Sequence, residues 1–439
     1  MGIPLVLRWI RERDRRGIVV GILSGGAGKI AGIATNVVAM PLAFSRLGEE
    51  RFGIFLMLMG LAQWVGLGNF GMHNSIARFI ADRGAGRRRI LLLLKVATLL
   101  AGGFGGLLVL ICTAAITLWY TTRAGSLGVA RAEVVSSAAL LLGLVWMRTV
   151  ISMASGVLIG RLQLYLVNWY QLIGQLTAFS LLVVVSFCWH HVAGFVLALV
   201  GGPLIGDVLS ALRVRRENGT EHFAWRQLRP WMPRLLSTGF SFTIINFAAS
   251  ACSGFLVFWV GAQTHPEDAA HFGLMMRVHG MMIGILTTLN NPLWPAMLDA
   301  NRTRDRKWLR RVIISYLLLV WAIAVSVGGL VAVFGDDLLR FWVGNDFGTG
   351  NVYRAMWGAM LGQAALIYFW DVVLIGLKKE RLVATTHLLR IAILGAFGAS
   401  LIPQYGGIGA MAALAIAYFL SETFTLPIAS WRAFAASVR

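Results

Sequence analysis

Long apolar stretches alternate with short polar, arginine-rich segments along the chain. A helix that crosses a membrane needs about 20 mostly apolar residues. By this criterion the pattern predicts twelve membrane-spanning helices. Their predicted ranges are 17–44, 53–77, 91–119, 134–160, 164–188, 191–212, 234–260, 271–297, 311–334, 352–377, 383–402 and 407–428. The connecting segments are too short to fold as a separate catalytic domain.

The composition agrees with a membrane protein. The 439 residues are 58% hydrophobic and only 13% charged, and the mean hydropathy is +0.73. Soluble domains carry about 25% charged residues, so a water-soluble enzyme, a disordered chain and a coiled coil are excluded. The three cysteines (Cys112, Cys188 and Cys252) lie in apolar runs without disulfide or metal-binding spacing. We therefore expect no metal and no cofactor.

The net charge of +20 is distributed unevenly between the predicted loops. With the N-terminus inside, the inner segments hold 30 Lys and Arg residues and the outer segments hold six. This count places Arg390 with the inner segment that begins at Lys378. Because basic residues are enriched in cytoplasmic loops, both termini are predicted to be cytoplasmic. Orientation and anionic lipid explain the excess charge, so no nucleic-acid partner is expected.

The two halves of the chain resemble each other. Three matches keep nearly the same offset: Phe52-Gly53 with Phe272-Gly273 at 220, 157–160 with 373–376 at 216, and Asp207 with Glu422 at 215. Six spans in each half give both halves the same orientation, and such parallel repeats are typical of transporters that work by alternating access. We predict an all-α polytopic protein with two pseudo-symmetric six-helix bundles. Its lobes are 1–212 and 234–439, joined by a cytoplasmic linker at 213–233.

Three basic residues lie inside predicted spans and are not counted with the adjoining inner or outer segments, namely Lys29, Arg148 and Arg277. A charge at the centre of a spanning helix costs about 2.5–3.5 kcal/mol on insertion scales, and such residues are functional by default. Lys29 and Arg148 are too deep for their side chains to reach the membrane surface. Arg277 is nine residues from Asp268 and can reach the outer interface. We predict a cationic, water-filled central cavity that binds an anionic ligand.

Three acids also lie inside predicted spans: Asp207, Asp371 and Glu422. They are candidates for proton or sodium coupling. One alternative is structural pairing with the cations, although the acids lie toward the inner ends of their helices. Another is that the acids reach the inner surface, which is most plausible for Asp207 because it is only six residues from Arg213.

Two asparagines are candidates for contacts with the ligand. Asn36 shares a helix face with Lys29, and Asn69 lies on the second span. Packing between membrane helices is the alternative role for such polar residues. The segment 25–30, Gly-Gly-Ala-Gly-Lys-Ile, imitates a phosphate-binding loop but lacks its first glycine and its Ser or Thr. We therefore expect a transporter without a built-in ATPase, not an enzyme.

The segment 41–53, with sequence PLAFSRLGEERFG, opens the second span, and GLGNFGM at 66–72 and ARF at 77–79 follow. This pattern of leucine-glycine, an acidic pair, aromatic-glycine and a glycine-rich helix end resembles the Wzx-type polysaccharide-transporter flippases. These belong to the multidrug/oligosaccharidyl-lipid/polysaccharide (MOP) exporter superfamily. Two six-helix halves also fit that family.

The resemblance implies that the protein moves an undecaprenyl-diphosphate-linked oligosaccharide across the bacterial inner membrane. The lipid tail would stay in the bilayer while the head group passes through a cation-lined cavity. Membrane lipids and other glycan-assembly proteins are the further partners it implies. Two alternatives stay open. The first is an ion-coupled drug or metabolite antiporter, although the drug exporters of the superfamily tend to have acidic cavities. The second is a membrane-embedded glycan polymerase or ligase, although such enzymes usually need a large outer loop.

Overall fold

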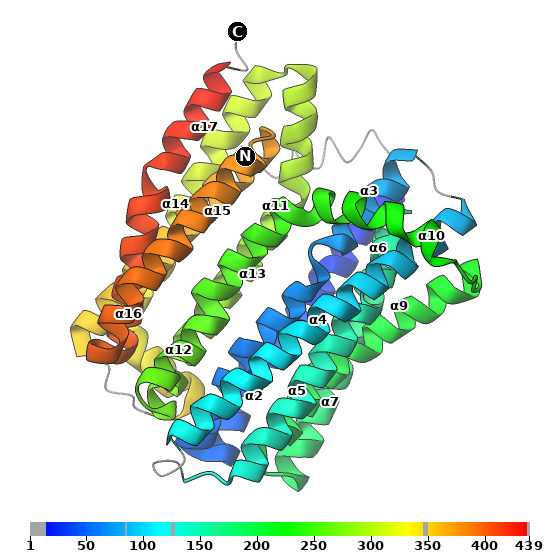
Figure 1. Ribbon diagram of the computed structural model, residues 1–439. Coiled ribbons are helices and arrows are strands. Elements are labelled where there is room, and N and C mark those ends of the chain that lie inside the picture. Colours follow the sequence, from blue (N-terminus) through cyan, green and yellow to red (C-terminus); the bar gives the residue numbers. More distant parts are fainter. Residues whose placement is uncertain (1–14, 84–85, 124–127, 162, 346–349, 437–439) are drawn as a thin grey trace. The chain divides into compact units, whose positions relative to one another are not determined.

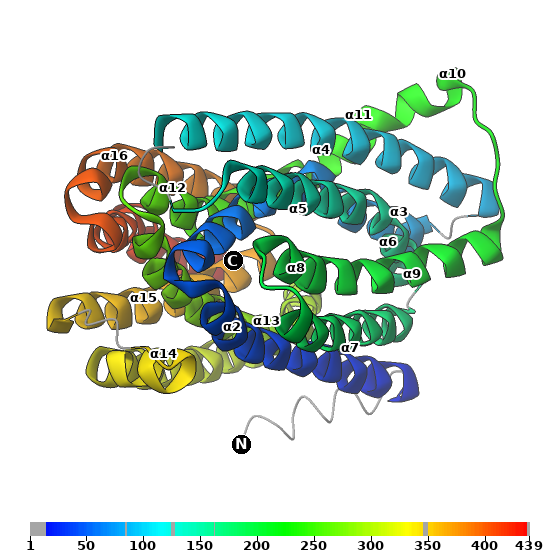
Figure 2. The same ribbon diagram turned by 90° about the horizontal axis from the view of Figure 1, so that it is seen from below.

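The computed structural model describes residues 15–83, 86–123, 128–161, 163–345 and 350–436. Within these ranges nearly every residue is helical and no β-strand is present, which confirms the predicted all-helical class. The chain divides into two compact units, Met1–Thr243 and Ile244–Arg439. Figures 1 and 2 show the helices of both units from two directions.

The helices of the first unit are α2 (Arg15–Gly66), η1 (Leu67–Asn69), α3 (Met72–Arg83), α4 (Arg87–Arg123), α5 (Arg131–Ile151), α6 (Met153–Gly160), α7 (Leu164–Cys188), α8 (Val192–Val196), η2 (Leu197–Gly201), α9 (Gly202–Asn218), α10 (Trp225–Leu228) and η3 (Arg229–Trp231). Helix α7 lies along α2 on one side and along α9 on the other (Figure 2). The helix α11 (Met232–Ser250) crosses the division between the units.

The helices of the second unit are η4 (Ala251–Phe255), α12 (Leu256–Gln263), α13 (Pro266–Thr303), α14 (Arg306–Val343), α15 (Gly350–Gly376), α16 (Glu380–Tyr418), η5 (Phe419–Thr423) and α17 (Thr425–Ala436). Helix α15 packs against α13, α14 and α16. The element η2 in the first unit and the elements η4 and η5 are π-helical turns. Such turns are rare and often occur at functional sites.

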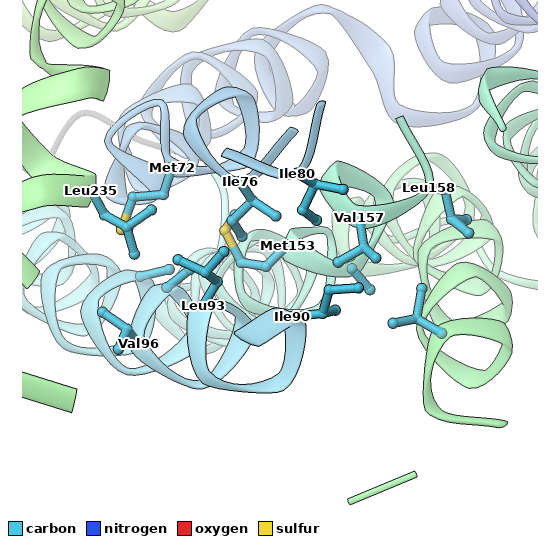
Figure 3. Packing of buried hydrophobic residues seen from close by; sticks show 14 of the residues in the cluster. Met72, Ile76, Ile80, Ile90, Leu93, Val96, Met153, Val157, Leu158 and Leu235 are labelled. Carbon is cyan, nitrogen blue, oxygen red and sulfur yellow. The ribbon is translucent and has the colours of Figure 1, made fainter. Parts of the chain in front are cut away.

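The core of the first unit forms where α3, α4 and α6 meet (Figure 3). Met72, Ile76 and Ile80 recur every four residues on α3, so they lie on one face of that helix. They pack with Leu93 of α4 and Val157 of α6, which are fully buried. This spacing explains why so short and polar a helix as α3 is held inside the bundle.

The predicted linker at 213–233 packs within the first unit. Val214 at its start and Leu228 near its end are buried in the same core as Leu235. The short helix α10 and the turn η3 therefore form part of the surface of this unit. The lobe boundaries predicted from the sequence stay a prediction.

Ten helices in the described part of the chain are long and apolar enough to cross a membrane. They are Ile30–Asn69, Arg87–Thr122, Arg131–Gly160, Leu164–Cys188, Val192–Asn218, Thr243–Gln263, Pro266–Thr287, Arg306–Val343, Gly350–Gly376 and Glu380–Phe434. Many of their apolar side chains are exposed, such as Leu110 of α4 at 69% and Leu318 of α14 at 63%. Exposed apolar surface on this scale indicates contact with lipid, so the protein is a multi-pass membrane protein.

Two of these ten helices contain a break at a glycine with positive φ. Gly48 has φ 75° in α2, and Gly406 has φ 55° in α16. Both glycines lie in segments where the sequence pattern predicts a loop between two spans. A Cβ at Gly409 would overlap the carbonyl oxygen of Leu401, although residues eight apart in a continuous helix are about 12 Å apart. The chain therefore reverses direction at Gly406, while the total of twelve spans stays a prediction.

Candidate functional site

An ion pair with a buried carboxylate lies in the first unit. The Nε atom of Arg148 on α5 donates to Oδ2 of Asp207 on α9 at 2.9 Å. Asp207 is 8% exposed, whereas 43% of the Arg148 side chain is exposed. Arg148 and Asp207 therefore pair with each other, as the structural alternative for the in-span charges expects. Because Asp207 is buried, its carboxylate does not reach the inner surface. Arg148 therefore keeps side-chain surface that can contact a ligand.

A histidine lies beside this pair, at the junction between α5 and α6. His73 of α3 has its Nδ1 atom 3.3 Å from the carbonyl oxygen of Ser152 and 3.2 Å from the hydroxyl oxygen of Ser155. The junction interrupts the regular hydrogen-bond ladder at Ser152, and a side chain that inserts there is a common cause of such an interruption. The result is a polar strip that joins α3, α5, α6 and α9 inside an apolar bundle.

The second unit contains a denser buried cluster. His387 of α16 places Nε2 at 3.1 Å from Oδ2 of Asp371 on α15 and at 3.5 Å from Oε1 of Glu422 in η5. One helical turn further on, Nη1 of Arg390 donates to Oε2 of Glu422 at 2.9 Å. The guanidinium carbon of Arg390 also lies 5.2 Å from the centre of the Tyr418 ring. All four charged or titratable side chains are buried, and Glu422 is 0% exposed.

The charges in this cluster balance only if it holds a proton. Asp371 and Glu422 contribute two negative charges when ionised, and Arg390 contributes one positive charge. A proton on His387, or on one carboxyl group, brings the sum to zero. Because an uncompensated buried charge is very costly, the geometry favours a cluster that binds one proton. Oδ1 of Asp371 and Nδ1 of His387 are buried without a hydrogen-bond partner in the described part of the chain.

The assignment of Arg390 to the inner loop is wrong. The residue lies within α16 and is 4% exposed, so it is a further cation inside a span. Its ten-residue separation from Glu380, at the start of α16, places it about 15 Å along the helix. The spacing of His387 and Arg390, three residues apart on one helix face, was the signal in the sequence that could have identified both.

The other predicted site residues have different environments. Arg277 is half-buried on α13 and forms no hydrogen bond or ion pair with the described residues. Asn36 donates from Nδ2 to the carbonyl oxygen of Gly32, and Asn69 accepts the amide of Gly71, each at 2.9 Å. Each local bond uses part of the hydrogen-bonding capacity of the asparagine side chain and leaves the rest for other partners. Lys29 lies in α2, and its side chain is outside the described residues.

The two clusters occupy related positions in the two halves. Asp207 and Glu422, which match at an offset of 215 in the sequence, are both buried and both form an ion pair with an arginine at 2.9 Å. Glu422 lies in the π-helical turn η5, and Asp207 follows the π-helical turn η2 by six residues. The arginines come from different helices of the repeat, because Arg148 is on the fourth predicted span and Arg390 on the eleventh.

The fold is that of the MOP superfamily transporters. An inward-facing multidrug-resistance transporter of the MATE family superposes with a TM-score of 0.66 at 13% identity, covering 95% of this chain and 94% of that one. A MOP superfamily transporter from Pyrococcus furiosus gives a TM-score of 0.61 at 14% identity over 96% of both chains. A MATE transporter from Vibrio cholerae gives 0.61 at 14% identity over 97% of both chains.

Residues 15–301 match the family described as polysaccharide biosynthesis protein, and the chain belongs to that family. No curated protein sequence matches the chain significantly. The protein is therefore a multi-pass membrane protein that belongs to a polysaccharide biosynthesis family and has a transporter fold. This combination agrees with the Wzx-type resemblance.

Proposed function

We propose that the protein is a flippase for a polyprenyl-diphosphate-linked oligosaccharide. It would move the head group from the cytoplasmic to the periplasmic leaflet of the bacterial inner membrane. The observation that carries the proposal is the match of 15–301 to a polysaccharide biosynthesis family on a chain with a transporter fold. Within that class, a lipid-linked glycan is the substrate that has to cross a membrane.

The cations in the spans support a diphosphate as the group that is recognised. Arginine and lysine form strong, charge-assisted hydrogen bonds with phosphate oxygens. Arg148 uses its Nε atom for Asp207 and keeps 43% of its side chain exposed. Arg277 has no carboxylate partner among the described residues. We propose that these two residues and Lys29 bind the diphosphate, and that Asn36 and Asn69 contact the sugars.

The acid cluster of the second unit supports coupling to protons. Asp371 and Glu422 face one histidine and one arginine, and the balance of charge favours one bound proton. We propose that protonation of this cluster changes during the transport cycle, and that Asp207 has the corresponding role in the first unit. Export driven in vesicles by a pH gradient should be lost in Glu422→Gln and Asp371→Asn.

The test of the proposal is genetic. Cells that lack the chain should accumulate lipid-linked oligosaccharide on the cytoplasmic side, and the wild-type chain should remove this accumulation. Lys29→Ala and Arg148→Ala should fail to do so at normal protein levels. Lys95→Ala is the matched control, because Lys95 is an exposed basic residue on α4 outside the proposed site. Full complementation by both site variants would contradict the cationic path, and absence of accumulation would contradict the flippase.

A second candidate is an ion-coupled antiporter of drugs or metabolites. It is favoured by the similarity of fold to a multidrug-resistance transporter of the MATE family. Efflux of ethidium from cells that express the chain distinguishes the two. Efflux that persists in Lys29→Ala and Arg148→Ala would support the antiporter, because a cationic drug does not need those charges.

A further inference from the structure

A polar pocket opens at one end of the second unit. It has a volume of about 540 Å³ and is formed by the turn between α12 and α13, the first turns of α15 and the break in α16. Its polar and aromatic lining includes the side chains of Gln263, His265, Asp268, Tyr353, Gln404 and Tyr405. In Figure 1 the turn between α12 and α13 lies at the opposite end of this unit from the C-terminus. The distribution of basic residues predicts that this end faces the outside.

The floor of the pocket is built by close contacts at the break in α16. A Cβ at Gly407 would lie 2.7 Å from the hydroxyl oxygen of Tyr353, and one at Gly406 would lie 3.6 Å from Cγ2 of Thr264. Tyr353 is buried, so its ring is fixed between α15 and the break. The backbone of the break and the buried Tyr353 therefore form one wall of the pocket, and exposed side chains such as Gln404 and Tyr405 form its rim.

The chemistry of the pocket favours polyhydroxylated, uncharged ligands over a diphosphate. No lysine or arginine lines it, so it lacks the cationic partners that phosphate groups prefer. Among the described residues no group of three His, Cys, Asp or Glu side chains is placed to hold a metal ion. The carboxylate of Asp268 forms no hydrogen bond or ion pair with the described residues, and the side chain of Gln404 is exposed. These groups can accept and donate hydrogen bonds to hydroxyl groups.

The aromatic lining completes the set of groups that a sugar needs. Tyr405 is 59% exposed at the break, and Tyr353 also lines the pocket. A tyrosine ring offers an apolar face together with a polar end, which suits the apolar face and hydroxyl rim of a sugar ring. The volume falls within the range of about 300–1,000 Å³ that is typical of small-molecule pockets.

We propose that this pocket is a carbohydrate subsite that binds uncharged sugar rings of the glycan at the outer end of the second unit. The proposal rests on the proposed function, because it assigns the glycan part of that substrate to a place separate from the cations. The diphosphate and the sugars are then recognised by different parts of the chain.

The test measures sugar binding directly. The full chain is purified in lipid nanodiscs, and saturation-transfer NMR is recorded with cellobiose and with methyl glycosides of glucose, galactose and N-acetylglucosamine. Wild type should bind at least one of these in preference to glucuronic acid. Tyr405→Ala should weaken that binding about tenfold, because ring stacking is lost, and Gln404→Ala should also weaken it.

Two variants make the result specific. Tyr405→Trp keeps an aromatic face and should retain binding. Phe341→Ala removes a side chain that is 93% exposed on α14 and does not line the pocket, so it should bind like wild type. Equal binding in wild type and Tyr405→Ala, absence of binding to every neutral sugar, or preference for glucuronic acid would overturn the subsite.

The outcome separates this proposal from the proposed function. If the wild-type chain clears the accumulated lipid-linked oligosaccharide from cells but binds none of the sugars, the subsite fails and the flippase stands. If the sugars bind in the pocket but the chain has no effect on that lipid, the flippase fails and the pocket remains a carbohydrate site.

Discussion

The two arginine–carboxylate pairs differ in how much each arginine is shielded. Arg390 and Glu422 are 5% and 0% exposed in their side chains, whereas Arg148 is 43% exposed and Asp207 only 11%. The buried Arg390 has almost no side-chain surface left for a ligand. A half-exposed arginine can hold its carboxylate and a ligand at the same time. We therefore expect Arg390 to hold Glu422 in place, whereas Arg148 fits the proposed ligand-binding role.

The role of Arg148 is tested by removing its charge alone and together with its partner. Arg148→Ala should lower export at least tenfold, because a lost charge-assisted hydrogen bond costs about 1.5–3 kcal/mol. Arg148→Ala with Asp207→Ala removes both charges and should recover thermal stability but not export. Export is measured by clearance of the lipid-linked oligosaccharide. Recovery of export in the double variant would show that Arg148 only neutralises Asp207.

The buried pair of the second unit should behave differently. Arg390→Ala should destabilise the protein by about 3–5 kcal/mol, because it leaves a buried carboxylate uncompensated. Arg390→Met with Glu422→Leu removes both charges, leaves Asp371 with His387, and should be close to neutral in stability. Thermal unfolding in detergent, followed by tryptophan fluorescence, measures the effect. An Arg390→Ala variant as stable as wild type would contradict the buried pair.

The sequence identified the deep charges but not their partners. Arg148, Asp207, Asp371 and Glu422 were identifiable from their distance along an apolar span. Which acid meets which cation depends on how five or six helices pack, and a single sequence does not contain that information. Arg390 lies only nine residues beyond Arg381. A count of loop charges therefore includes Arg390, because such a count does not consider how deep the residue lies in its span.

At the scale of the elements, the apolar pattern predicts helices well and their ends less well. The predicted span at 164–188 coincides with α7, and the span at 352–377 differs from α15 by two residues at its start. The breaks at Gly48 and Gly406 lie in the segments that the pattern leaves between two predicted spans. The π-helical turns were not predictable, because their hydrogen-bond pattern depends on the neighbouring helices.

The break in α16 should depend on glycine at its centre. Gly406 has φ 55° and ψ −129°, a backbone conformation that other residues adopt only at a cost of about 1–3 kcal/mol. Gly406→Ala should lower the melting temperature and the yield of folded protein. Gly395→Ala on the same helix is the control, because a Cβ there meets open space, and it should be neutral or slightly stabilising. Equal effects of the two substitutions would contradict the strained break.

At the scale of the whole molecule, the distribution of charge predicts the orientation of the protein in the membrane. The excess of basic residues in the predicted inner segments accounts for the net charge of +20. It predicts that a phosphatase reporter fused after Arg439 is inactive and that one inserted in the predicted outer loop at 335–351 is active. Reporter activity in the periplasm measures both, and the opposite pattern would reverse the orientation of every site described above.

A flippase moves a glycan lipid from one leaflet to the other, and this movement can be measured with purified components. Liposomes carry a fluorescent polyprenyl-diphosphate oligosaccharide in both leaflets, and an added glycosidase cleaves only the outer pool. With the reconstituted wild-type chain, the inner pool should become cleavable, and with Lys29→Ala or Arg148→Ala it should stay protected. An inner pool that stays protected in the presence of the folded wild-type chain and an imposed pH gradient would contradict the flippase.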